Sequence, residues 1–325
     1  MGTKRLMNIG ERKAIELISG LLSKGDVAVG IGDDCAALDL GKDYLLVTTD
    51  MITVKTHTPQ ATPRQIGWHL IAINLSDVAC KGGKPIGVVT ALGFPRDTPL
   101  AFVKELAKGM DLCARTFGTS VIGGDTKESC DVTLTGTAFG LVKKNAFMPR
   151  SGAHVGDLVA VTGRLGGAAA GYQAIKHRLK RPTAIKALLE PWPRVPEGIA
   201  LGKAHAANSC IDISDGLSTS LHHLAGASGV GFSISFDMLP VHDAVQKVGF
   251  RNSEEIEGAV LHFGGEYELL MTLDPKGLAK ARTAIEGCGT ELTVIGVVTR
   301  SKVLLEKDGK MRPLPNKGWE HFRKH

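Results

Sequence analysis

The sequence predicts an α/β protein built from two domains, and three observations lead to that prediction. The chain has 325 residues, a length more natural for two hydrophobic cores than for one. Hydrophobic residues make up 43% of it, charged residues 22%, and 40 residues are glycine, which is typical of a globular α/β protein rather than a disordered or disulfide-stapled one. Segments with the spacing of strands also alternate with segments with the spacing of helices.

The first half is predicted to contain three helices and a set of short strands. An amphipathic segment at 11–22 carries apolar residues at helical spacing. The segment 63–80 opens with proline and is followed by two glycines, the order typical of a helix start and stop. The remaining predicted elements are a helix at 100–117 and strands at 27–29, 44–49, 86–92, 119–122 and 132–142, the last with clear alternation.

A polar, basic stretch at 143–156 contains Pro149 and Gly152 and is predicted to be a connector. We therefore expect one domain at 1–150 and a second at 151–325. The second domain is predicted to alternate strand and helix, with elements at 158–162, 166–177, 195–206, 210–213, 217–225, 232–236, 267–273, 278–285 and 292–298.

Composition argues against several classes of protein. No apolar stretch reaches the roughly 18 to 20 residues of a membrane helix, and the first ten residues lack the apolar region of a signal peptide, so we expect no membrane association and a cytoplasmic protein. The six cysteines include no C-x-x-C pair, which disfavours a zinc site or a disulfide framework. The net charge of +6 is diffuse and lacks interleaved aromatic residues, so we expect no nucleic-acid partner.

Aspartates recur beside glycine, serine and threonine, in what the pattern predicts to be tight turns at strand ends. Any one of them could simply cap a helix or stabilise a turn. Gathered together, such carboxylates would repel one another unless a cation neutralised them. Carboxylate and hydroxyl oxygens favour a hard ion such as Mg²⁺, which bridges to substrate phosphates. The motifs are Gly32-Asp33-Asp34, Thr48-Thr49-Asp50, Asn74-Leu75-Ser76-Asp77, Gly123-Gly124-Asp125 and Asp212-Ile213-Ser214-Asp215-Gly216.

The chain has neither a P-loop motif nor the motif set of the protein kinases, so neither of those nucleotide sites is expected. A glycine- and alanine-rich segment at 162–171 follows a predicted strand and opens a predicted helix. Its backbone amides could approach a phosphate, or its small residues could serve only the close packing of helix on sheet. The sequence leaves both readings open.

A group of longer motifs occurs in a fixed order along nearly the whole chain: Gly30-Ile31-Gly32-Asp33-Asp34-Cys35-Ala36, Asn74-Leu75-Ser76-Asp77, Ile122-Gly123-Gly124-Asp125-Thr126, Arg150-Ser151-Gly152, Asp212-Ile213-Ser214-Asp215-Gly216-Leu217 and Gly318-Trp319-Glu320-His321-Phe322. These motifs resemble the thiamine-monophosphate kinase family, within the aminoimidazole-ribonucleotide synthetase-like superfamily. The resemblance implies a two-domain fold of α+β type. It also implies that the first domain binds metal and nucleotide and dimerises into a shared β-barrel, while the second domain completes the active site.

The resemblance further implies a reaction and the residues that perform it. The reaction is ATP- and Mg²⁺-dependent phosphorylation of thiamine monophosphate to thiamine diphosphate, by direct in-line transfer that yields ADP, in a homodimer. The implied ligands of several Mg²⁺ ions are Asp34, Thr48, Thr49, Asp50, Asp77, Asp125, Asp212 and Asp215, with catalytic roles for Asp50 and Asp212. The implied ATP contacts are Gly124, Asp125, Arg150 and Ser214, and the implied substrate contacts are His57, Glu266 and Trp319.

Three positions depart from the family pattern. The usual Gly-Gly-Glu-Asp string is here Gly264-Gly265-Glu266 followed directly by Tyr267, so Glu266 is the substrate carboxylate under one alignment and its neighbour under another. Thr58 and Ser220 replace a frequent aromatic residue and a frequent aspartate. Two alternatives stay open at this point: another ATP-using member of the superfamily, such as a selenophosphate synthetase-like enzyme, or a non-catalytic nucleotide-binding homologue.

Overall fold

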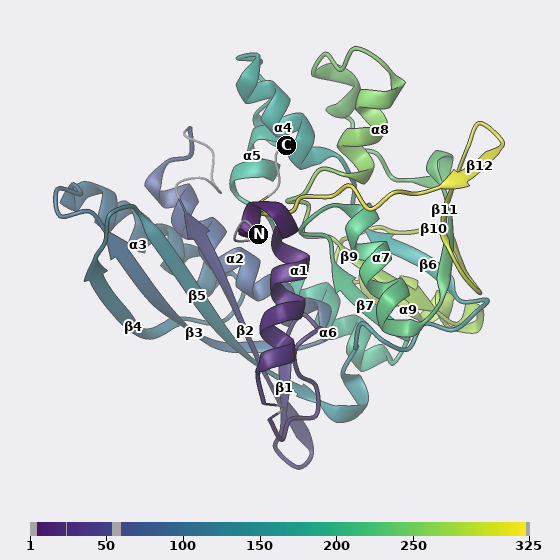
Figure 1. Ribbon diagram of the computed structural model, residues 1–325, viewed down its shortest axis with the longest axis horizontal. Coiled ribbons are helices and arrows are strands. Elements are labelled where there is room, and N and C mark those ends of the chain that lie inside the picture. Colours follow the sequence, from purple (N-terminus) through teal and green to yellow (C-terminus); the bar gives the residue numbers. More distant parts are fainter. Residues whose placement is uncertain (1–4, 24, 54–59, 323–325) are drawn as a thin grey trace.

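The protein folds into two α/β domains that lie side by side in the computed structural model (Figure 1). The structure describes residues 5–23, 25–53 and 60–322. Helix α1 (Leu6–Leu21), kinked at Gly10, packs on the second domain. There Arg12 donates to the Thr219 hydroxyl at 3.3 Å, and the backbone N–H of His321 donates to the Glu11 carboxylate at 3.0 Å. The expectation of two α/β domains is confirmed.

The first domain is a five-stranded sheet with two helices on one face. Its strands are arranged in the order β1-β2-β5-β3-β4, and among these pairs only β3 and β4 are parallel. Helix α2 packs on β2 and β5, and α3 packs on α2. The elements are β1 (Ala36–Asp39), β2 (Asp43–Thr53), α2 (Pro63–Cys80), β3 (Lys84–Phe94), α3 (Leu100–Thr116), β4 (Val121–Glu128) and β5 (Thr133–Lys143).

Helix α2 is the central element of the first domain and is buried along almost its whole length. It begins with a capping box, in which the Thr62 hydroxyl accepts from the Gln65 N–H at 3.3 Å and the Gln65 side chain accepts from the Thr62 N–H at 3.0 Å. Two glycines let α2 and α3 cross closely. A Cβ at Gly67 would lie 2.1 Å from the Leu106 carbonyl oxygen, and one at Gly109 would lie 1.9 Å from that of Arg64.

The opposite face of the first sheet is open to solvent. Side chains alternate between the two faces of a strand, so Leu46 and Thr48 of β2 face α2 whereas Met51 faces outward. Met51 and Leu141 are exposed on this open face. Among the described strands each sheet has two free edges, and the predicted barrel, which would need a partner chain, stays a prediction.

The second domain is a seven-stranded sheet in the order β12-β11-β8-β10-β6-β9-β7, flanked by six α-helices among the described residues. Its inner strands carry the apolar core, which includes Val159, Leu270 and Ile295. The elements are β6 (Leu158–Thr162), α4 (Gly167–Lys176), α5 (Pro182–Leu189), α6 (Val195–Ala204), β7 (Ser209–Asp212), α7 (Leu217–Ser228), β8 (Gly231–Ser235), α8 (Ser253–Leu261), β9 (Leu269–Leu273), α9 (Leu278–Glu286), β10 (Leu292–Thr299), β11 (Val303–Lys307) and β12 (Lys310–Pro313). No helix in the described part of the chain has the length and apolarity needed to span a membrane.

Several expectations about local structure were wrong. The segment 27–29 contributes only an isolated bridge from Val29 to Ala37. The aspartate motifs do not all lie in turns at strand ends: Thr48–Asp50 lies within β2, Asn74–Asp77 within α2, and Gly123–Asp125 within β4. In α2 the polar side chains are satisfied by partners, since Asn74 donates to the Leu70 carbonyl at 2.9 Å, so these residues do not break the helix.

Candidate active site

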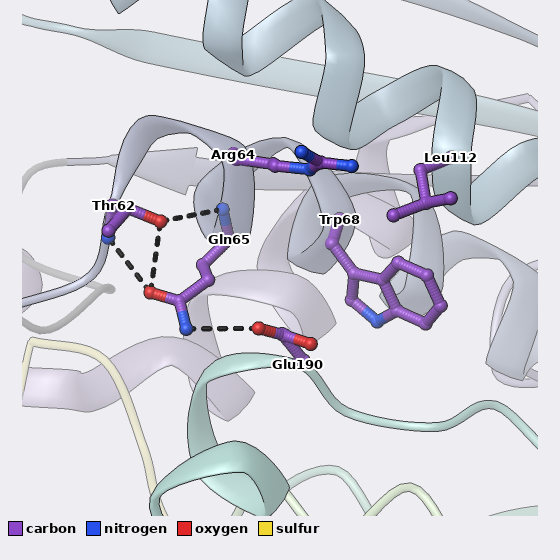
Figure 2. Close-up of a pocket in the computed structure, with 6 residues that line it drawn as sticks. All are labelled: Thr62, Arg64, Gln65, Trp68, Leu112 and Glu190. Carbon is purple, nitrogen blue, oxygen red and sulfur yellow. Dashed lines mark hydrogen bonds between the residues drawn. The ribbon is translucent and has the colours of Figure 1, made fainter.

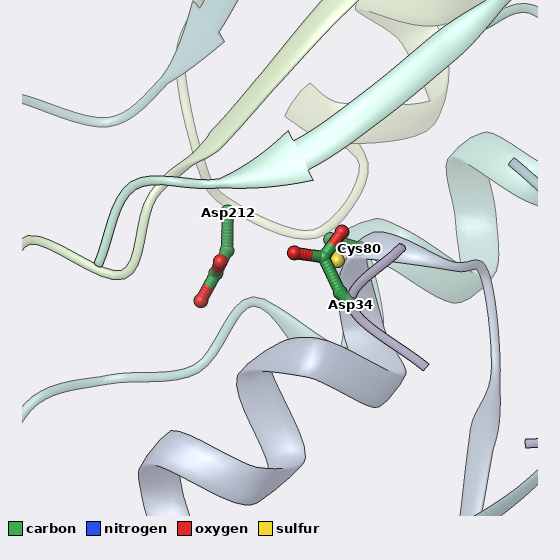
Figure 3. Close-up of side chains that lie close together, drawn as sticks. All are labelled: Asp34, Cys80 and Asp212. Carbon is green, nitrogen blue, oxygen red and sulfur yellow. The ribbon is translucent and has the colours of Figure 1, made fainter. Parts of the chain in front are cut away.

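Four aspartates from separate parts of the chain gather where the two domains meet. Asp34 precedes β1, Asp50 lies in β2, Asp77 in α2, and Asp212 ends β7 of the second domain. Figure 3 shows two of them, Asp34 and Asp212, beside Cys80; the ligand atoms of these three side chains all lie within 4.8 Å of one another. The gathering of these carboxylates agrees with the metal cluster predicted from the sequence, although their roles as ligands stay predictions.

Short hydrogen bonds fix the orientation of these carboxylates. The Thr48 hydroxyl donates to Asp77 Oδ2 at 2.5 Å, and the Ser76 hydroxyl donates to Asp212 Oδ2 at 2.5 Å. The second bond joins a helix of the first domain to a strand of the second. The hydroxyl groups of Thr48 and Ser76 therefore orient the carboxylates of Asp77 and Asp212.

Three of these carboxylates carry raised pKa values. Burial and the charge of Asp34 raise the pKa of Asp50 to about 6 and that of Asp212 to about 7. Burial and the charges of Asp50 and Asp212 raise the pKa of Asp77 well above its usual range. Mutual repulsion among these carboxylates thus adds to the effect of burial. Carboxylate and hydroxyl oxygens at this spacing suit a hard divalent cation, so the residues present fit the expected Mg²⁺.

Asp34 differs from Asp50, Asp77 and Asp212 because its carboxylate is paired with two cationic side chains. Its Oδ2 lies 2.7 Å from Lys81 Nζ, and its Oδ1 accepts from Arg150 Nη2. Burial alone would raise the pKa of Asp34, but the charges of Lys81 and Arg150 hold it well below the usual range. An ion at Asp34 would have to share the carboxylate with both cations. The sequence analysis missed Lys81, which lacked any recognisable motif of its own.

Cys80 does not make this a site for a soft metal. The Cys80 thiol donates to the backbone carbonyl of Asp77 at 3.2 Å. Burial and the charge of Asp34 raise the pKa of Cys80 well above its usual range. Carboxylate oxygens outnumber this single sulfur, which favours a hard cation over a soft one.

Asp215 and Ser214 lie in the turn after β7. Burial and the charge of Glu11 raise the pKa of Asp215 to about 6, and Asp50 contributes to the same shift. The backbone carbonyl of Asp215 accepts from the backbone N–H of Trp319 at 3.1 Å, and the backbone carbonyl of Ser214 accepts from the backbone N–H of Gly265 at 2.6 Å. This turn thus brings the C-terminal segment and the Glu266 loop next to the end of β7.

Two of the predicted metal ligands lie on the opposite face of the first sheet. Thr49 follows Thr48 and therefore points the other way; its hydroxyl donates to the Gly136 carbonyl at 2.9 Å. Asp125 lies on the edge strand β4 with 62% of its side chain exposed, and it pairs with Lys127 at 3.3 Å. The single chain does not bring Thr49 and Asp125 into the cluster. His57, a predicted substrate contact, lies outside the described residues.

Glu266 lies at a cavity of about 370 Å³ in the second domain. Its Oε1 accepts from the backbone N–H groups of Gly166 and Ala168 at 3.0 and 3.1 Å, at the start of α4. The amides of the glycine-rich segment are thus occupied by a carboxylate rather than open to a phosphate. Burial raises the pKa of Glu266 to about 8 despite these hydrogen bonds. The described lining, which does not include Trp319, is Gly163, Arg164, Gly167, Thr183, Lys186, Ala187, Glu190, Trp192, Arg194, His242, Glu266 and Glu268.

A buried ionic network forms one wall of this cavity. Arg194 binds Glu268 through two hydrogen bonds, Nη2 to Oε1 at 2.5 Å and Nε to Oε2 at 2.7 Å, and its Nη1 donates to Glu197 at 3.3 Å. The Thr162 hydroxyl donates to Glu268 at 2.6 Å. The sequence analysis missed this network because its central pair, Arg194 and Glu268, is 74 residues apart in sequence.

A smaller cavity of about 160 Å³ lies at the start of α2, away from the carboxylate cluster (Figure 2). Gln65 crosses it and donates to Glu190 at 3.0 Å. Glu190 lines both cavities. Gln65 and Thr62 also form the cap of α2. The polar groups here therefore start the helix and join it to the second domain through Glu190.

The chain is similar to known proteins over most of its length. Family models match the AIR synthase related protein N-terminal domain over residues 32–142 and its C-terminal domain over residues 154–305. The thiamine-monophosphate kinase of Pyrococcus horikoshii is 33% identical over 296 residues, which cover 90% of this chain and 91% of that protein. The thiamine-monophosphate kinase of Escherichia coli (strain K12) is 33% identical over 310 residues, 92% of this chain and 94% of that protein. The solved structure of AaThiL complexed with AMPPCP and TMP matches with a TM-score of 0.85 and 29% identity, covering 99% of this chain and 100% of that one.

Proposed function

The chain belongs to the thiamine-monophosphate kinase family, and from this premise we propose that it transfers the γ-phosphoryl group of ATP directly to thiamine monophosphate, with Mg²⁺, giving thiamine diphosphate and ADP. Its relatives in this family are kinases, and the chain is therefore a kinase. The similar AaThiL structure holds AMPPCP and TMP, which supports ATP and thiamine monophosphate as the substrates here.

One observation carries the proposal: the carboxylates of Asp50, Asp77 and Asp212 lie together with raised pKa values, Asp212 being buried and the other two partly buried. A site that only stabilised the fold would not retain mutually repelling carboxylates without a cation. The presence of these groups disfavours a non-catalytic homologue, and among the residues that the structure describes no feature of the site favours a selenophosphate synthetase-like reaction.

In the proposed mechanism the chain positions two phosphate groups and needs no strong base. The second pKa of a phosphate monoester is about 6, so the attacking oxygen is already largely ionised at neutral pH. Asp50, Asp77 and Asp212 would hold Mg²⁺, which when bound neutralises charge on the ATP phosphates. The contribution of the chain is then alignment of the two phosphates for in-line attack. His57 is proposed to position the substrate rather than to remove a proton.

The predicted ATP contacts fall into two groups. Arg150 and Ser214 lie beside the carboxylate cluster, and Arg150 already pairs with Asp34. Gly124 and Asp125 lie on β4, beside the open face of the first sheet. We propose that a second copy of the chain covers this face to form the shared barrel, since exposed Met51 and Leu141 would otherwise stay in water. Asp125 would then act at the interface between copies.

The cavity at Glu266 is the proposed place for part of the substrate. Glu266 lies with one oxygen on the amides of α4 and at the cavity wall, and Trp192 offers an aromatic face in the same lining. A ring nitrogen that exchanges a hydrogen bond with the carboxyl group of Glu266 would suit this lining. This supports the alignment in which Glu266 is the substrate carboxylate.

Replacing Trp319 with alanine is predicted to raise the KM for thiamine monophosphate while leaving kcat unchanged. Trp319 is 44% exposed beside the Asp215 turn, and an indole face attracts the permanent cation of a thiazolium ring by about 0.5 to 2 kcal/mol, which corresponds to a KM increase of about 2- to 30-fold. Steady-state titration of each substrate separately measures the effect. Phe322→Ala, which removes another exposed aromatic side chain, is the control. An unchanged KM in a folded Trp319→Ala protein would remove Trp319 from the substrate site.

The proposed function is tested by identifying acceptor and products. The protein is incubated with ATP, Mg²⁺ and either thiamine monophosphate or free thiamine, and nucleotides and thiamine phosphates are separated by chromatography. We expect ADP and thiamine diphosphate, formed only from thiamine monophosphate. Release of AMP, or turnover of free thiamine alone, would mean that the chain transfers a diphosphoryl group or uses another acceptor.

A further inference from the structure

Lys81 is a fully buried lysine whose ammonium group lies among two carboxylates and a backbone carbonyl. Its Nζ lies 2.7 Å from Asp33 Oδ1 and 2.7 Å from Asp34 Oδ2, and it donates to the Cys210 carbonyl at 2.8 Å. The ammonium thus forms one hydrogen bond and two ion pairs. The side-chain exposure is 0% for Lys81, 8% for Asp33 and 1% for Asp34, so this is a buried charge that the fold has built around its partners.

Asp33 has further contacts that keep this arrangement rigid. Its Oδ1 accepts from the Asp34 N–H at 2.8 Å, and its Oδ2 accepts from the Arg150 N–H at 2.9 Å. Lys81 follows directly on α2, which ends at Cys80. The ammonium is therefore placed by a helix end, two successive carboxylates and a strand of the other domain.

The two ends of the acidic cluster differ in how their charge is balanced. Asp33 and Asp34 face the charges of Lys81 and Arg150. Within the described part of the chain, no lysine or arginine forms an ion pair with Asp50, Asp77 or Asp212. A cation added beside Asp50, Asp77 and Asp212 would therefore relieve more electrostatic repulsion than one added beside Asp33 and Asp34.

We propose that the Lys81 ammonium is a built-in cation that takes the place of one divalent ion at the Asp33–Asp34 end of the cluster, so that divalent metal binds at the Asp50, Asp77 and Asp212 end. The proposal rests on the metal-dependent function proposed above. It makes Lys81 a positioning residue, which sets where metal binds and how many ions the protein needs, and it revises the expected role of Asp34 from metal ligand to partner of fixed cations.

Lys81 could instead be only a link between domains, through its bond to the Cys210 carbonyl. The two roles predict different behaviour when the charge is removed. A link contributes to stability equally with and without metal. A built-in cation, once removed, leaves two buried carboxylates that a divalent ion can neutralise, so the loss of stability should be reversed by the ion.

The test is a Mn²⁺ titration of wild-type and Lys81→Met protein without nucleotide or thiamine phosphate, with free Mn²⁺ followed by electron paramagnetic resonance. We expect the variant to bind about one additional Mn²⁺ per chain, because the ammonium that repels an ion at Asp33 and Asp34 has gone. The melting temperature of the variant should be lowered without Mn²⁺ and restored by it. Since no substrate is present, the result is independent of which reaction the enzyme performs.

Three further variants complete the experiment. Lys81→Arg keeps the charge and should bind as many ions as the wild type. Lys81→Met/Asp33→Asn removes one carboxylate together with the lysine and should also return the ion count to that of the wild type. Lys108→Met removes an exposed lysine paired with Glu105 and should change neither quantity. An unchanged ion count with a melting temperature lowered equally with and without Mn²⁺ overturns the proposal. Failure of the Lys81→Met protein to fold at every Mn²⁺ concentration tested would also overturn the proposal.

Discussion

Asp212→Asn is expected to lower kcat about a thousandfold, a loss of the size seen when one charge-stabilising group is removed from an active site. Asp212 lies buried at the end of β7 and accepts the Ser76 hydroxyl at 2.5 Å. Asparagine keeps an oxygen for that bond but removes the negative charge that would hold metal. Asp50→Asn should have a similar effect for the same reason.

The same substitution should not weaken the fold. Burial and the charge of Asp34 raise the pKa of Asp212 to about 7. Because the folded-state pKa lies above the unfolded value, ionising Asp212 makes the protein less stable as the pH rises from about 4 to about 7, and the loss is constant above that. Without metal, Asp212→Asn should therefore be more stable than the wild type at pH 8 and similar to it near pH 4.

Turnover and thermal unfolding of the two proteins at both pH values measure these effects. Asp111→Asn, which removes an exposed aspartate paired with Arg115, serves as the control and should leave kcat unchanged. Turnover of Asp212→Asn within about threefold of the wild type at saturating Mg²⁺ would show that Asp212 does not hold the metal, given the losses usual for such groups.

The largest expected loss of stability comes from Arg194→Met. Arg194 makes two hydrogen bonds to Glu268 and one to Glu197, and their side chains are only 18%, 8% and 3% exposed, respectively. Removing one partner of a buried ion pair leaves its counter-charges unbalanced and usually costs about 3 to 5 kcal/mol of unfolding free energy. Urea unfolding measures the difference.

Two further variants separate this effect from the general loss of an arginine. Arg282→Met removes an exposed arginine 3.6 Å from Glu286 and should change the unfolding free energy by less than about 1 kcal/mol. Arg194→Met/Glu268→Gln removes both charges and should recover part of the loss. If Arg194→Met and Arg282→Met behaved alike, the network around Glu268 would not be a source of stability.

Local signals in the sequence predicted some elements closely. Helix α2 was predicted with the bounds Pro63–Cys80 that it has in the structure, because a proline opens it and glycines follow it. Strand β6 was also predicted with its observed bounds. Helix α8 was missed although Asn252 caps it by accepting from the Glu255 N–H at 2.9 Å, a signal that the sequence contains.

The sequence did not predict how the side chains of its motifs would be placed. Alternation along β2 sends Thr48 to the cluster and Thr49 to the open face, and a motif that names both cannot separate them. Lys81 and Arg194 were missed because their partners lie far away in sequence, as with Arg194 and Glu268, which are 74 residues apart. Such pairs become visible only when the fold brings them together.

The central claim is that the buried carboxylate cluster uses a divalent ion to pass a phosphoryl group from ATP to thiamine monophosphate. The most direct measurement is phosphorus NMR of the protein with both substrates, recorded first with excess chelator and then after Mg²⁺ is added. We predict no reaction in the chelator and, after Mg²⁺, the signals of ADP and thiamine diphosphate growing at equal rates. Thiamine diphosphate formed at the same rate in the chelator, or ATP cleaved to ADP and free phosphate with thiamine monophosphate unchanged, would contradict it.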